Sequence, residues 1–188
     1  MKISELEIPG VFKSTSRIEG DQRGTFREWF RDSVFFDATK TNFVPTQANL
    51  SISSKNTLRG IHYSLAREGQ SKWVTCVTGS LLDLVIDLRV GSPTFGNHLF
   101  VTLESNSGDS IYIPNGFGHA FLALQDQTCI TYLLSSEYAP SLEYEISPLD
   151  SSLKIHWPDV EFLMSKKDFN APSFESQKAS NLLPQFRD

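Results

Sequence analysis

Short stretches with the composition of β-strands follow one another at close intervals through the middle of the chain. They are rich in β-branched, aromatic and aliphatic residues, and turn signals such as Thr-Gly-Ser at 78–80 and Gly-Ser-Pro at 91–93 separate them. Many strands at such short spacing are typical of a β-sandwich or a β-barrel. The predicted strands cover residues 44–54, 72–77, 81–88, 98–103, 110–113, 119–124 and 129–134.

Helical periodicity is scarce by comparison. We expect a short helix after Asp32, a turn near Ser141–Glu145 and a helix over Phe174–Leu183. Ser173 is suited to begin the last of these helices, and Pro184 is suited to end it.

The chain has 188 residues, of which 39% are hydrophobic. This size suits a single domain, because one hydrophobic core remains efficient up to ~250 residues. We expect the core of that domain to span about residues 20–170, and we expect residues 171–188 to form a surface appendage, because few apolar side chains follow Asn170. Cys76 and Cys129 lie in apolar strand-like runs, so we expect buried hydrophobic residues rather than a disulfide or a ligand pair.

The charge distribution argues against nucleic acid and membrane partners. The chain has 17 basic and 22 acidic residues and a net charge of −5, without long runs of like charge. Its first residues, MKISELEIPG, lack the pattern of a signal peptide, and no stretch approaches the ~18 consecutive apolar residues of a membrane helix. We therefore expect a cytoplasmic protein.

The first predicted strand is two-sided and carries Gln47 and Asn49 on its polar face. The stretch that follows it contains Arg59, His62 and Lys72. An isolated histidine is usually held by backbone partners, and this alternative stays open for His62. A histidine among cationic and amide side chains is instead suited to act as an acid or base, because the unperturbed pKa of imidazole is ~6.5.

A second informative stretch is Gly108-Asp-Ser-Ile-Tyr-Ile-Pro114-Asn-Gly116-Phe-Gly-His119-Ala-Phe-Leu-Ala. Its spacing of glycine, proline, glycine and histidine resembles the second motif of cupins, which are double-stranded β-helix jelly rolls. The glycines permit backbone conformations that other residues avoid, and the proline presets a turn. The resemblance implies an all-β cupin jelly roll with a few short helices, in which His119 starts a strand and faces the barrel interior.

The ligand set of a metal-bearing cupin is incomplete in this chain. The first motif of such cupins supplies two histidines one residue apart, and the corresponding residues here are His62 and Ser64. Because zinc and iron sites require three or four protein ligands in definite geometry, we expect a barrel without a metal.

Further motifs lie in a consistent order between roughly residues 20 and 170. They are Asp21-Gln-Arg-Gly-Thr-Phe-Arg-Glu28, Gln47-Ala-Asn49-Leu-Ser, Leu58-Arg-Gly-Ile-His62-Tyr, Gln70-Ser-Lys72, Asp83-Leu-Val-Ile-Asp-Leu-Arg-Val-Gly-Ser-Pro-Thr-Phe-Gly96, Ile113-Pro-Asn-Gly-Phe-Gly-His119-Ala-Phe and Tyr138-Ala-Pro. Together they resemble the dTDP-4-dehydrorhamnose 3,5-epimerase family.

The resemblance implies an isomerase of deoxysugar biosynthesis that acts on a nucleoside-diphosphate 4-keto-6-deoxyhexose, with dTDP as the expected nucleotide. The C4 ketone acidifies the protons on C3 and C5, so a base can remove one and an acid can return it on the opposite face without an organic cofactor. The resemblance implies that His62 is the base, that Asp168 pairs with it, and that Tyr132 is the proton donor.

Other family positions imply contacts with the substrate. Lys72 would stabilise the developing charge on O4 together with His119, from a strand adjacent to that of His62; the alternative is an ordinary solvated lysine. Arg23 and Arg59 match arginines that contact the phosphates.

The remaining matched positions include Tyr138, which corresponds to the residue that stacks on the nucleotide base, although packing in the core is an alternative for it. Further matched contacts are Glu28, Gln47, Asn49, Glu143 and Lys167. Family members are generally dimers that exchange an N-terminal strand, so the resemblance implies a homodimer in which Arg23 and Glu28 complete the neighbour's pocket.

Some positions depart from typical members of the family. Ser64 replaces a glutamine, Trp73 follows Lys72, and Leu133-Leu134 stand where polar or basic residues are common. These features are similar to relatives that invert only C3 or only C5, so the sequence leaves open whether one carbon or both are inverted. A metal-dependent cupin oxygenase or isomerase and a sugar-binding cupin without turnover remain as alternative classes.

Overall fold

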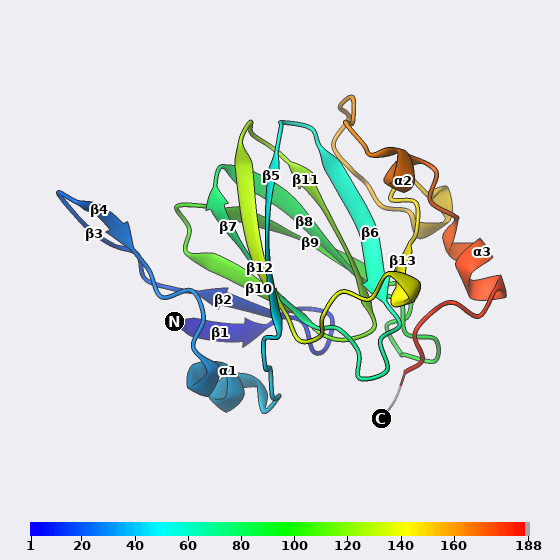
Figure 1. The fold of residues 1–188 in the computed structure, drawn as a ribbon, viewed down its shortest axis with the longest axis horizontal. Coiled ribbons are helices and arrows are strands. Elements are labelled where there is room, and N and C mark those ends of the chain that lie inside the picture. The colour runs from blue at the N-terminus through cyan, green and yellow to red at the C-terminus, as the bar shows by residue number, and fades with distance from the viewer. Residues whose placement is uncertain (187–188) are drawn as a thin grey trace.

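The computed structural model describes residues 1–186 and consists mainly of two antiparallel sheets that enclose a common interior (Figure 1). The six-stranded sheet has the order β1-β2-β10-β7-β12-β5, and the five-stranded sheet has the order β13-β6-β11-β8-β9. Apolar side chains of both sheets meet in an interior core, with Val74 and Ile130 from the first sheet and Val85 and Phe121 from the second. This architecture confirms the predicted all-β jelly roll with a few short helices.

The strands are β1 (Lys2–Glu5), β2 (Phe12–Thr15), β3 (Glu19–Asp21), β4 (Gly24–Phe26), β5 (Gln47–Ser53), β6 (Leu58–Ser64), β7 (Lys72–Thr78), β8 (Ser80–Asp87), β9 (His98–Glu104), β10 (Asp109–Ile113), β11 (Phe117–Ala123), β12 (Thr128–Leu134) and β13 (Glu143–Glu145). The helices are α1 (Asp32–Thr39), α2 (Lys166–Phe169) and α3 (Phe174–Ala179), with 3-10 turns η1 (Pro140–Leu142) and η2 (Ser151–Leu153).

Each strand predicted between residues 44 and 134 is present, with its ends displaced by a few residues at most. Strands β1 to β4, β6 and β13 lie outside the predicted set. In β6, Gly60 and the polar side chains of Arg59 and His62 interrupt the apolar alternation, and pairing with β11 and β13 makes it a strand. A period-2 pattern detects strands by their own composition. It therefore misses a strand that is formed mainly by pairing with neighbouring strands.

Trp73 belongs to an aromatic cluster on the outer face of the six-stranded sheet. Its indole is fully buried against Phe35, and its Nε1 donates a hydrogen bond to the backbone oxygen of Trp29 at 2.9 Å. Leu133 packs against the same cluster, which joins α1 to the sheet. Two of the positions that depart from the typical family pattern therefore face away from the barrel interior.

The C-terminal segment packs on the outer face of the five-stranded sheet, at the right of Figure 1. Phe174 and Leu183 are only 7% and 3% exposed and belong to the same apolar cluster as Ile61. The hydroxyl of Tyr63 donates to the backbone oxygen of Leu182 at 2.9 Å. The expected surface appendage is therefore wrong, because its few apolar residues fill sites on the sheet. Helix α3 is also shorter than predicted and ends at Ala179.

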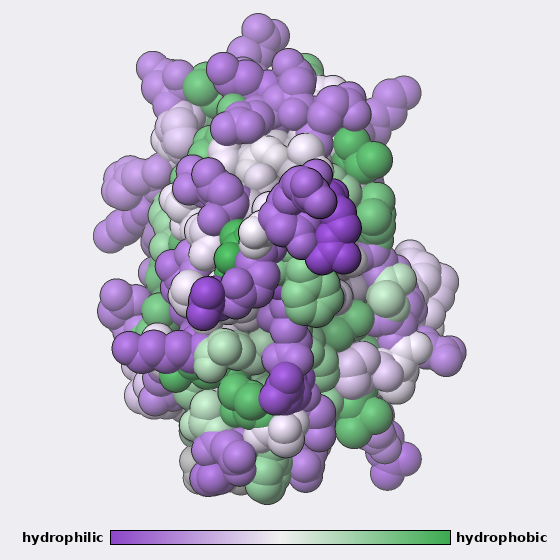
Figure 2. Space-filling view, turned by 90° about the vertical axis from the view of Figure 1, so that its left-hand side faces the viewer, coloured by the Kyte–Doolittle hydropathy of each residue, from purple (hydrophilic) through white to green (hydrophobic). Residues whose placement is uncertain are grey.

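Strands β3 and β4 form a hairpin arm that projects away from both sheets (Figure 1). All residues of the two strands are exposed, and Phe26 is 72% exposed. Figure 2 shows the molecule from the side on which the arm projects, where hydrophobic residues lie among predominantly hydrophilic ones. An isolated two-stranded hairpin is marginally stable in water, so the arm is suited to pack against something outside this chain.

Two sequence-based expectations concern the environment of the chain. Among residues 1–186, no helix combines the length and apolar character that crossing a membrane requires. Cys76 and Cys129 are buried free thiols, and burial raises the pKa of Cys76 to about 11. Their prediction as buried hydrophobic residues is confirmed.

Candidate active site

Polar and apolar residues alternate along β5, and its polar side chains face the barrel interior. Gln47 and Asn49 are partly buried, whereas Leu50 and Ile52 on the opposite face are 63% and 54% exposed. Successive side chains of a strand point to opposite faces, so the apolar face of β5 is its outer face. The polar face therefore supplies hydrogen-bonding groups to the interior.

Tyr132 and Lys72 lie on the same wall as these amides. Tyr132 is paired with Asn49, and Leu134 is paired with both Gln47 and Lys72. Directly paired residues in an antiparallel ladder point to the same side of the sheet, and the alternate residues of β7 and β12 belong to the interior core. Both predicted side chains therefore face the interior from the six-stranded sheet.

The strand of Lys72 is not adjacent to the strand of His62. β7 lies in the six-stranded sheet and β6 in the five-stranded sheet. The expected adjacency is wrong because the connection at residues 65–71 crosses from one sheet to the other, as jelly rolls do. This crossing places the two side chains on facing walls.

His62 lies on the second wall, directly across from His119 on the neighbouring strand. Ile61 and Tyr63 pack on the outer face of this sheet, so His62 between them points inward. Gly60 has a φ of +106°, and a Cβ built on it would lie 2.5 Å from the backbone oxygen of His119. Only glycine allows β6 and β11 to approach so closely beside the two histidines.

His62 forms a pair with Asp168. Its Nε2 lies 2.6 Å from Oδ1 of Asp168, a residue of α2 that is 4% exposed. Burial alone would raise the pKa of Asp168, but hydrogen bonds from His62, Ser165 and the Gly60 backbone outweigh it and hold this pKa below its usual value. The carboxylate form is therefore favoured, and it faces one nitrogen of a ring whose side chain is 43% exposed.

A second histidine–carboxylate pair lies beside the first. Nε2 of His119 is 2.8 Å from Oδ2 of Asp83, and both residues are buried. Asp83 is absent from the predicted site residues. The signal for it is a carboxylate within the apolar run of β8, since a buried charge requires a partner.

Lys72 is a buried amine near two carboxylates. It is 8% exposed, and burial lowers its pKa to about 8, although Glu143 and Asp83 act to raise it. Oε1 of Glu143 accepts hydrogen bonds from Ser64 Oγ and Gln70 Nε2, each at 3.2 Å. This burial contradicts the alternative of a solvated lysine.

The family model of dTDP-4-dehydrorhamnose 3,5-epimerase matches residues 5–176. The chain belongs to this family. It is 43% identical to the dTDP-4-dehydrorhamnose 3,5-epimerase of Mycolicibacterium smegmatis, over 100% of this chain and 93% of the relative.

Solved structures of epimerases share the fold over almost the whole chain. The RmlC epimerase of Mycobacterium tuberculosis is 42% identical, with a TM-score of 0.94 and coverage of 99% of this chain and 94% of that one. ChmJ, a 3'-monoepimerase from Streptomyces bikiniensis solved in complex with dTDP-quinovose, is 41% identical, with a TM-score of 0.91 and coverage of 96% and 91%.

Two residues that the family pattern assigns to the nucleotide lie at opposite ends of β5, Tyr138 beside Gln47 and Arg59 beside Ser53. Tyr138 is 58% exposed, so the alternative of core packing is wrong for it. Its backbone N–H donates to Oε1 of Gln47 at 2.8 Å, and Nε2 of Gln47 donates to Oδ1 of Asn49 at 2.9 Å. Nε of Arg59 donates to Ser53 Oγ at 3.1 Å and links β6 to β5. Lys167 is bound to Glu145 at 3.0 Å, beside the His62–Asp168 pair.

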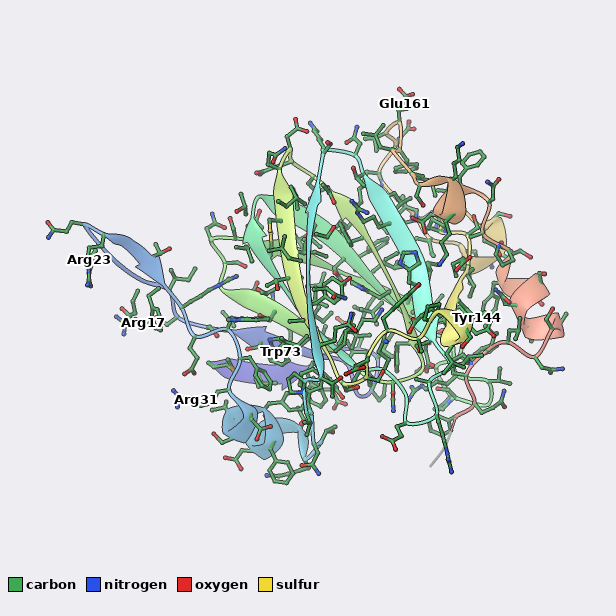
Figure 3. The ribbon with its side chains drawn as sticks, in the orientation of Figure 1. Arg17, Arg23, Arg31, Trp73, Tyr144 and Glu161 are labelled. Atoms are coloured by element: carbon green, nitrogen blue, oxygen red, sulfur yellow. The ribbon has the colours of Figure 1, made fainter. Side chains whose placement is uncertain are left out.

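Arg23 and Glu28 lie apart from this group of epimerase-family residues. Arg23 sits at the tip of the arm, far from the barrel in Figure 3, and pairs with Asp21. Glu28 follows the arm and accepts hydrogen bonds from Arg31, the shorter at 2.6 Å. Within one chain, the structure does not bring these two predicted residues together with His62.

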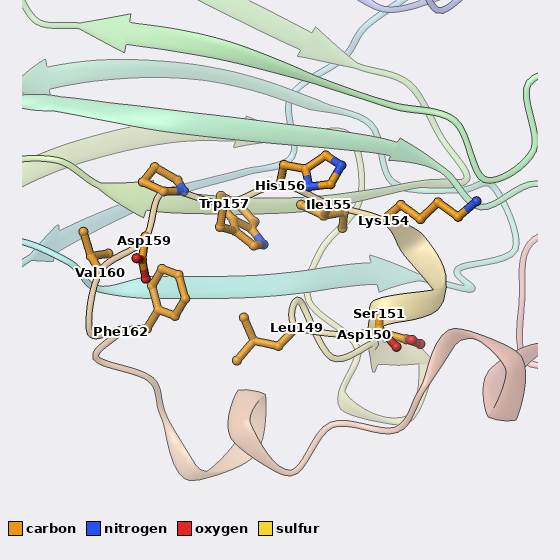
Figure 4. A pocket seen from close by; sticks show the side chains of 11 residues that line it. Leu149, Asp150, Ser151, Lys154, Ile155, His156, Trp157, Asp159, Val160 and Phe162 are labelled. Carbon is orange, nitrogen blue, oxygen red and sulfur yellow. The ribbon is translucent and has the colours of Figure 1, made fainter.

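A cavity of about 540 Å³ lies elsewhere, in the segment that covers the five-stranded sheet (Figure 4). Its lining comes from residues 149–162 and includes Leu149, His156, Trp157 and Phe162. The predicted catalytic side chains lie on β6, β7, β12 and α2 instead, so the cavity is separate from the candidate active site.

Proposed function

We propose that this member of the epimerase family inverts C3, C5 or both in a nucleoside-diphosphate 4-keto-6-deoxyhexose. The observation that carries the proposal is the pairing of His62 with buried Asp168 on one wall, while Tyr132 faces the same interior from the other wall. The relative that holds dTDP-quinovose supports dTDP as the nucleotide. Such a substrate is consistent with the cytoplasmic location expected from the sequence.

The first step is removal of a proton beside the ketone. Because Nε2 of His62 is engaged by Asp168, Nδ1 is the nitrogen that takes the proton. The C–H bond breaks, its electron pair forms the C=C bond of an enolate, and the charge moves to O4. The carboxylate of Asp168 stabilises the imidazolium that results.

The enolate is stabilised by hydrogen-bond donors of the interior. Lys72 in its protonated form donates to O4, and His119 supplies a second donor. In a buried site such a donor contributes more than in water, and removal of one typically costs ~2.7–4 kcal/mol of transition-state stabilisation.

The second step returns a proton to the opposite face of the sugar. The Tyr132 hydroxyl protonates the carbon, which re-forms the ketone and inverts the centre. The phenol exchanges its hydroxyl hydrogen with solvent, so the new C–H bond carries a hydrogen from water.

Inversion of a single carbon is the second candidate function. The identity to a 3'-monoepimerase, 41%, is nearly the same as the 43% identity to a 3,5-epimerase. Both activities use the same chemistry and differ in which carbon reaches the base.

Deuterium incorporation tests the proposal and separates the two candidates. Purified protein is incubated with dTDP-4-keto-6-deoxyglucose in deuterated water, and the sugar is analysed by NMR. Label at C3 and C5 supports the 3,5-epimerase, and label at one carbon supports the monoepimerase. Absence of label at both carbons over hours would overturn the proposal.

We also propose that the protein acts as a homodimer. The arm is exposed, and the outer face of β5 presents Leu50 and Ile52 at 63% and 54% exposure. Exposed apolar side chains on the outer face of a strand are suited to an isologous contact with a second copy. Such a contact would also give the arm, with Arg23 and Glu28, a partner barrel. Analytical ultracentrifugation at micromolar concentration distinguishes the dimer from a monomer.

A further inference from the structure

We propose that Ser165 is a positioning residue of the active site, which orients the carboxylate of Asp168 so that Oδ1 stays directed at His62. The inference rests on the proposed function, in which His62 and Asp168 form the basic pair. Ser165 is outside the predicted site residues and assists the reaction only through Asp168.

The contacts of Ser165 fix both parts of Asp168. Its Oγ accepts a hydrogen bond from the Asp168 backbone N–H at 3.0 Å and donates one to Asp168 Oδ2 at 3.0 Å. The remaining oxygen, Oδ1, lies 2.6 Å from Nε2 of His62. One hydroxyl can serve as donor and acceptor at once, so this side chain, together with the Gly60 backbone N–H, fixes how the carboxylate is rotated.

This arrangement differs from an ordinary capping box. Ser165 is the N-cap of α2 and Asp168 stands three residues later, which is the spacing of that motif. In a capping box the later side chain reaches back to the backbone N–H of the cap residue. Here Oδ2 of Asp168 accepts from the Ser165 hydroxyl, and Oδ1 of Asp168 faces His62. Ser165 therefore caps the helix and also orients a carboxylate.

The backbone that carries the pair is anchored by other bonds. Leu163 accepts from the Leu58 N–H at 3.0 Å and donates to the Asn56 oxygen at 2.9 Å, which fixes the segment to the start of β6. Lys167 of α2 is bound to Glu145 of β13 at 3.0 Å. Loss of the Ser165 hydroxyl should thus leave α2 in place and release mainly the rotation of the Asp168 side chain.

Three variants test the proposal kinetically. Ser165→Ala removes the hydroxyl, Ser165→Thr keeps it, and Ser173→Ala removes the equivalent cap of α3, whose hydroxyl accepts from Ser176 N–H. We expect Ser165→Ala to lower kcat roughly 10- to 100-fold with little change in KM, because a misplaced base affects the chemical step. Ser165→Thr should restore most of kcat, and Ser173→Ala should resemble the unmodified protein.

The pKa of Asp168 provides a second test, because it would not change on substitution of Ser165 if this residue only capped the helix. The carboxyl carbon of Asp168 is followed by NMR as a function of pH in the protein without substrate. Hydrogen bonds to a carboxylate favour its charged form, so Ser165→Ala should raise the pKa of Asp168, whereas Ser165→Thr and Ser173→Ala should not.

The two measurements separate this inference from the proposed function. If the unmodified protein incorporates no deuterium, the proposed function fails, and the titration still reports whether Ser165 orients Asp168. The inference is overturned if Ser165→Ala keeps both kcat and the pKa of Asp168. It is also overturned if Ser173→Ala causes the same loss, or if Ser165→Thr gives no rescue.

Discussion

His62 on β6 and Tyr132 on β12 face the same barrel interior from opposite sheets. A sugar ring bound between them would have the proposed base on one face and the proposed acid on the other. Inversion of a carbon requires this arrangement, because a single group on one face would return the proton to the side it came from. The two-sheet fold is therefore directly linked to the stereochemistry of the proposed reaction.

Substitution of these two residues should have different consequences. We expect His62→Ala to abolish deuterium exchange at every carbon, because general base catalysis contributes ~10²–10⁴-fold. Tyr132→Phe should still permit proton removal, so deuterium should enter the recovered substrate while inversion falls by a similar factor. NMR of the sugar after incubation in deuterated water distinguishes label with inversion from label without it.

His156 offers a matched control for the first of these variants. It is an exposed histidine in the separate segment at residues 149–162, so His156→Ala should retain exchange and inversion. Full activity of His62→Ala or Tyr132→Phe would contradict the assigned roles.

Activity should decline as the pH rises through about 8. Burial lowers the pKa of Lys72 to about 8, so above this pH the amine loses the proton with which, in the proposed mechanism, it stabilises the enolate. In Lys72→Arg the guanidinium stays charged, so the alkaline decline should disappear even though the rate is lower. The pH profile of kcat/KM measures both effects. An unchanged alkaline decline in Lys72→Arg would assign it to a different group.

Arg23 provides a test of the proposed exchange of arms. If the arm of one subunit completes the site of the other, Arg23→Ala and His62→Ala are each inactive as homodimers but complement one another when mixed. A heterodimer then has one site with both residues intact, so a statistical mixture should regain about a quarter of the normal activity. Mixing under conditions that allow subunit exchange, followed by the epimerase assay, tests this. A mixture with no more activity than its components would place Arg23 outside the partner's site.

Strand-like composition bounded by turn signals was sufficient to predict seven of the strands between residues 44 and 134. It did not detect β6 or β13, although β6 carries His62, because their pairing partners rather than their composition make them strands. The sheet to which each strand belongs also escaped prediction. The 65–71 connection has no sequence signal that distinguishes a hairpin from a crossing between sheets, and so Lys72 was expected beside His62.

Residues of the candidate site could be selected from the sequence where a family motif contains them, and residues that contact a selected residue were missed. Asp83 and Ser165 each bind a predicted residue through a side-chain contact. Ser165 precedes Asp168 at capping-box spacing, which shows only that a helix begins there. Its use for orienting a carboxylate depends on the position of β6, which lies more than a hundred residues earlier in the chain.

The C-terminal segment should contribute to stability, contrary to its expected role as an appendage. Phe174→Ala and Leu183→Ala each remove a buried side chain and should lower the free energy of unfolding by about 2–5 kcal/mol. Phe169→Ala is the matched control, because this phenylalanine is 71% exposed and its loss should change stability by about 0.5 kcal/mol at most. Urea denaturation at a fixed protein concentration measures all three, since subunit association also affects unfolding. If Phe174→Ala and Leu183→Ala changed the free energy of unfolding no more than Phe169→Ala does, the C-terminal segment would not contribute to the stability of the apolar cluster on the outer face.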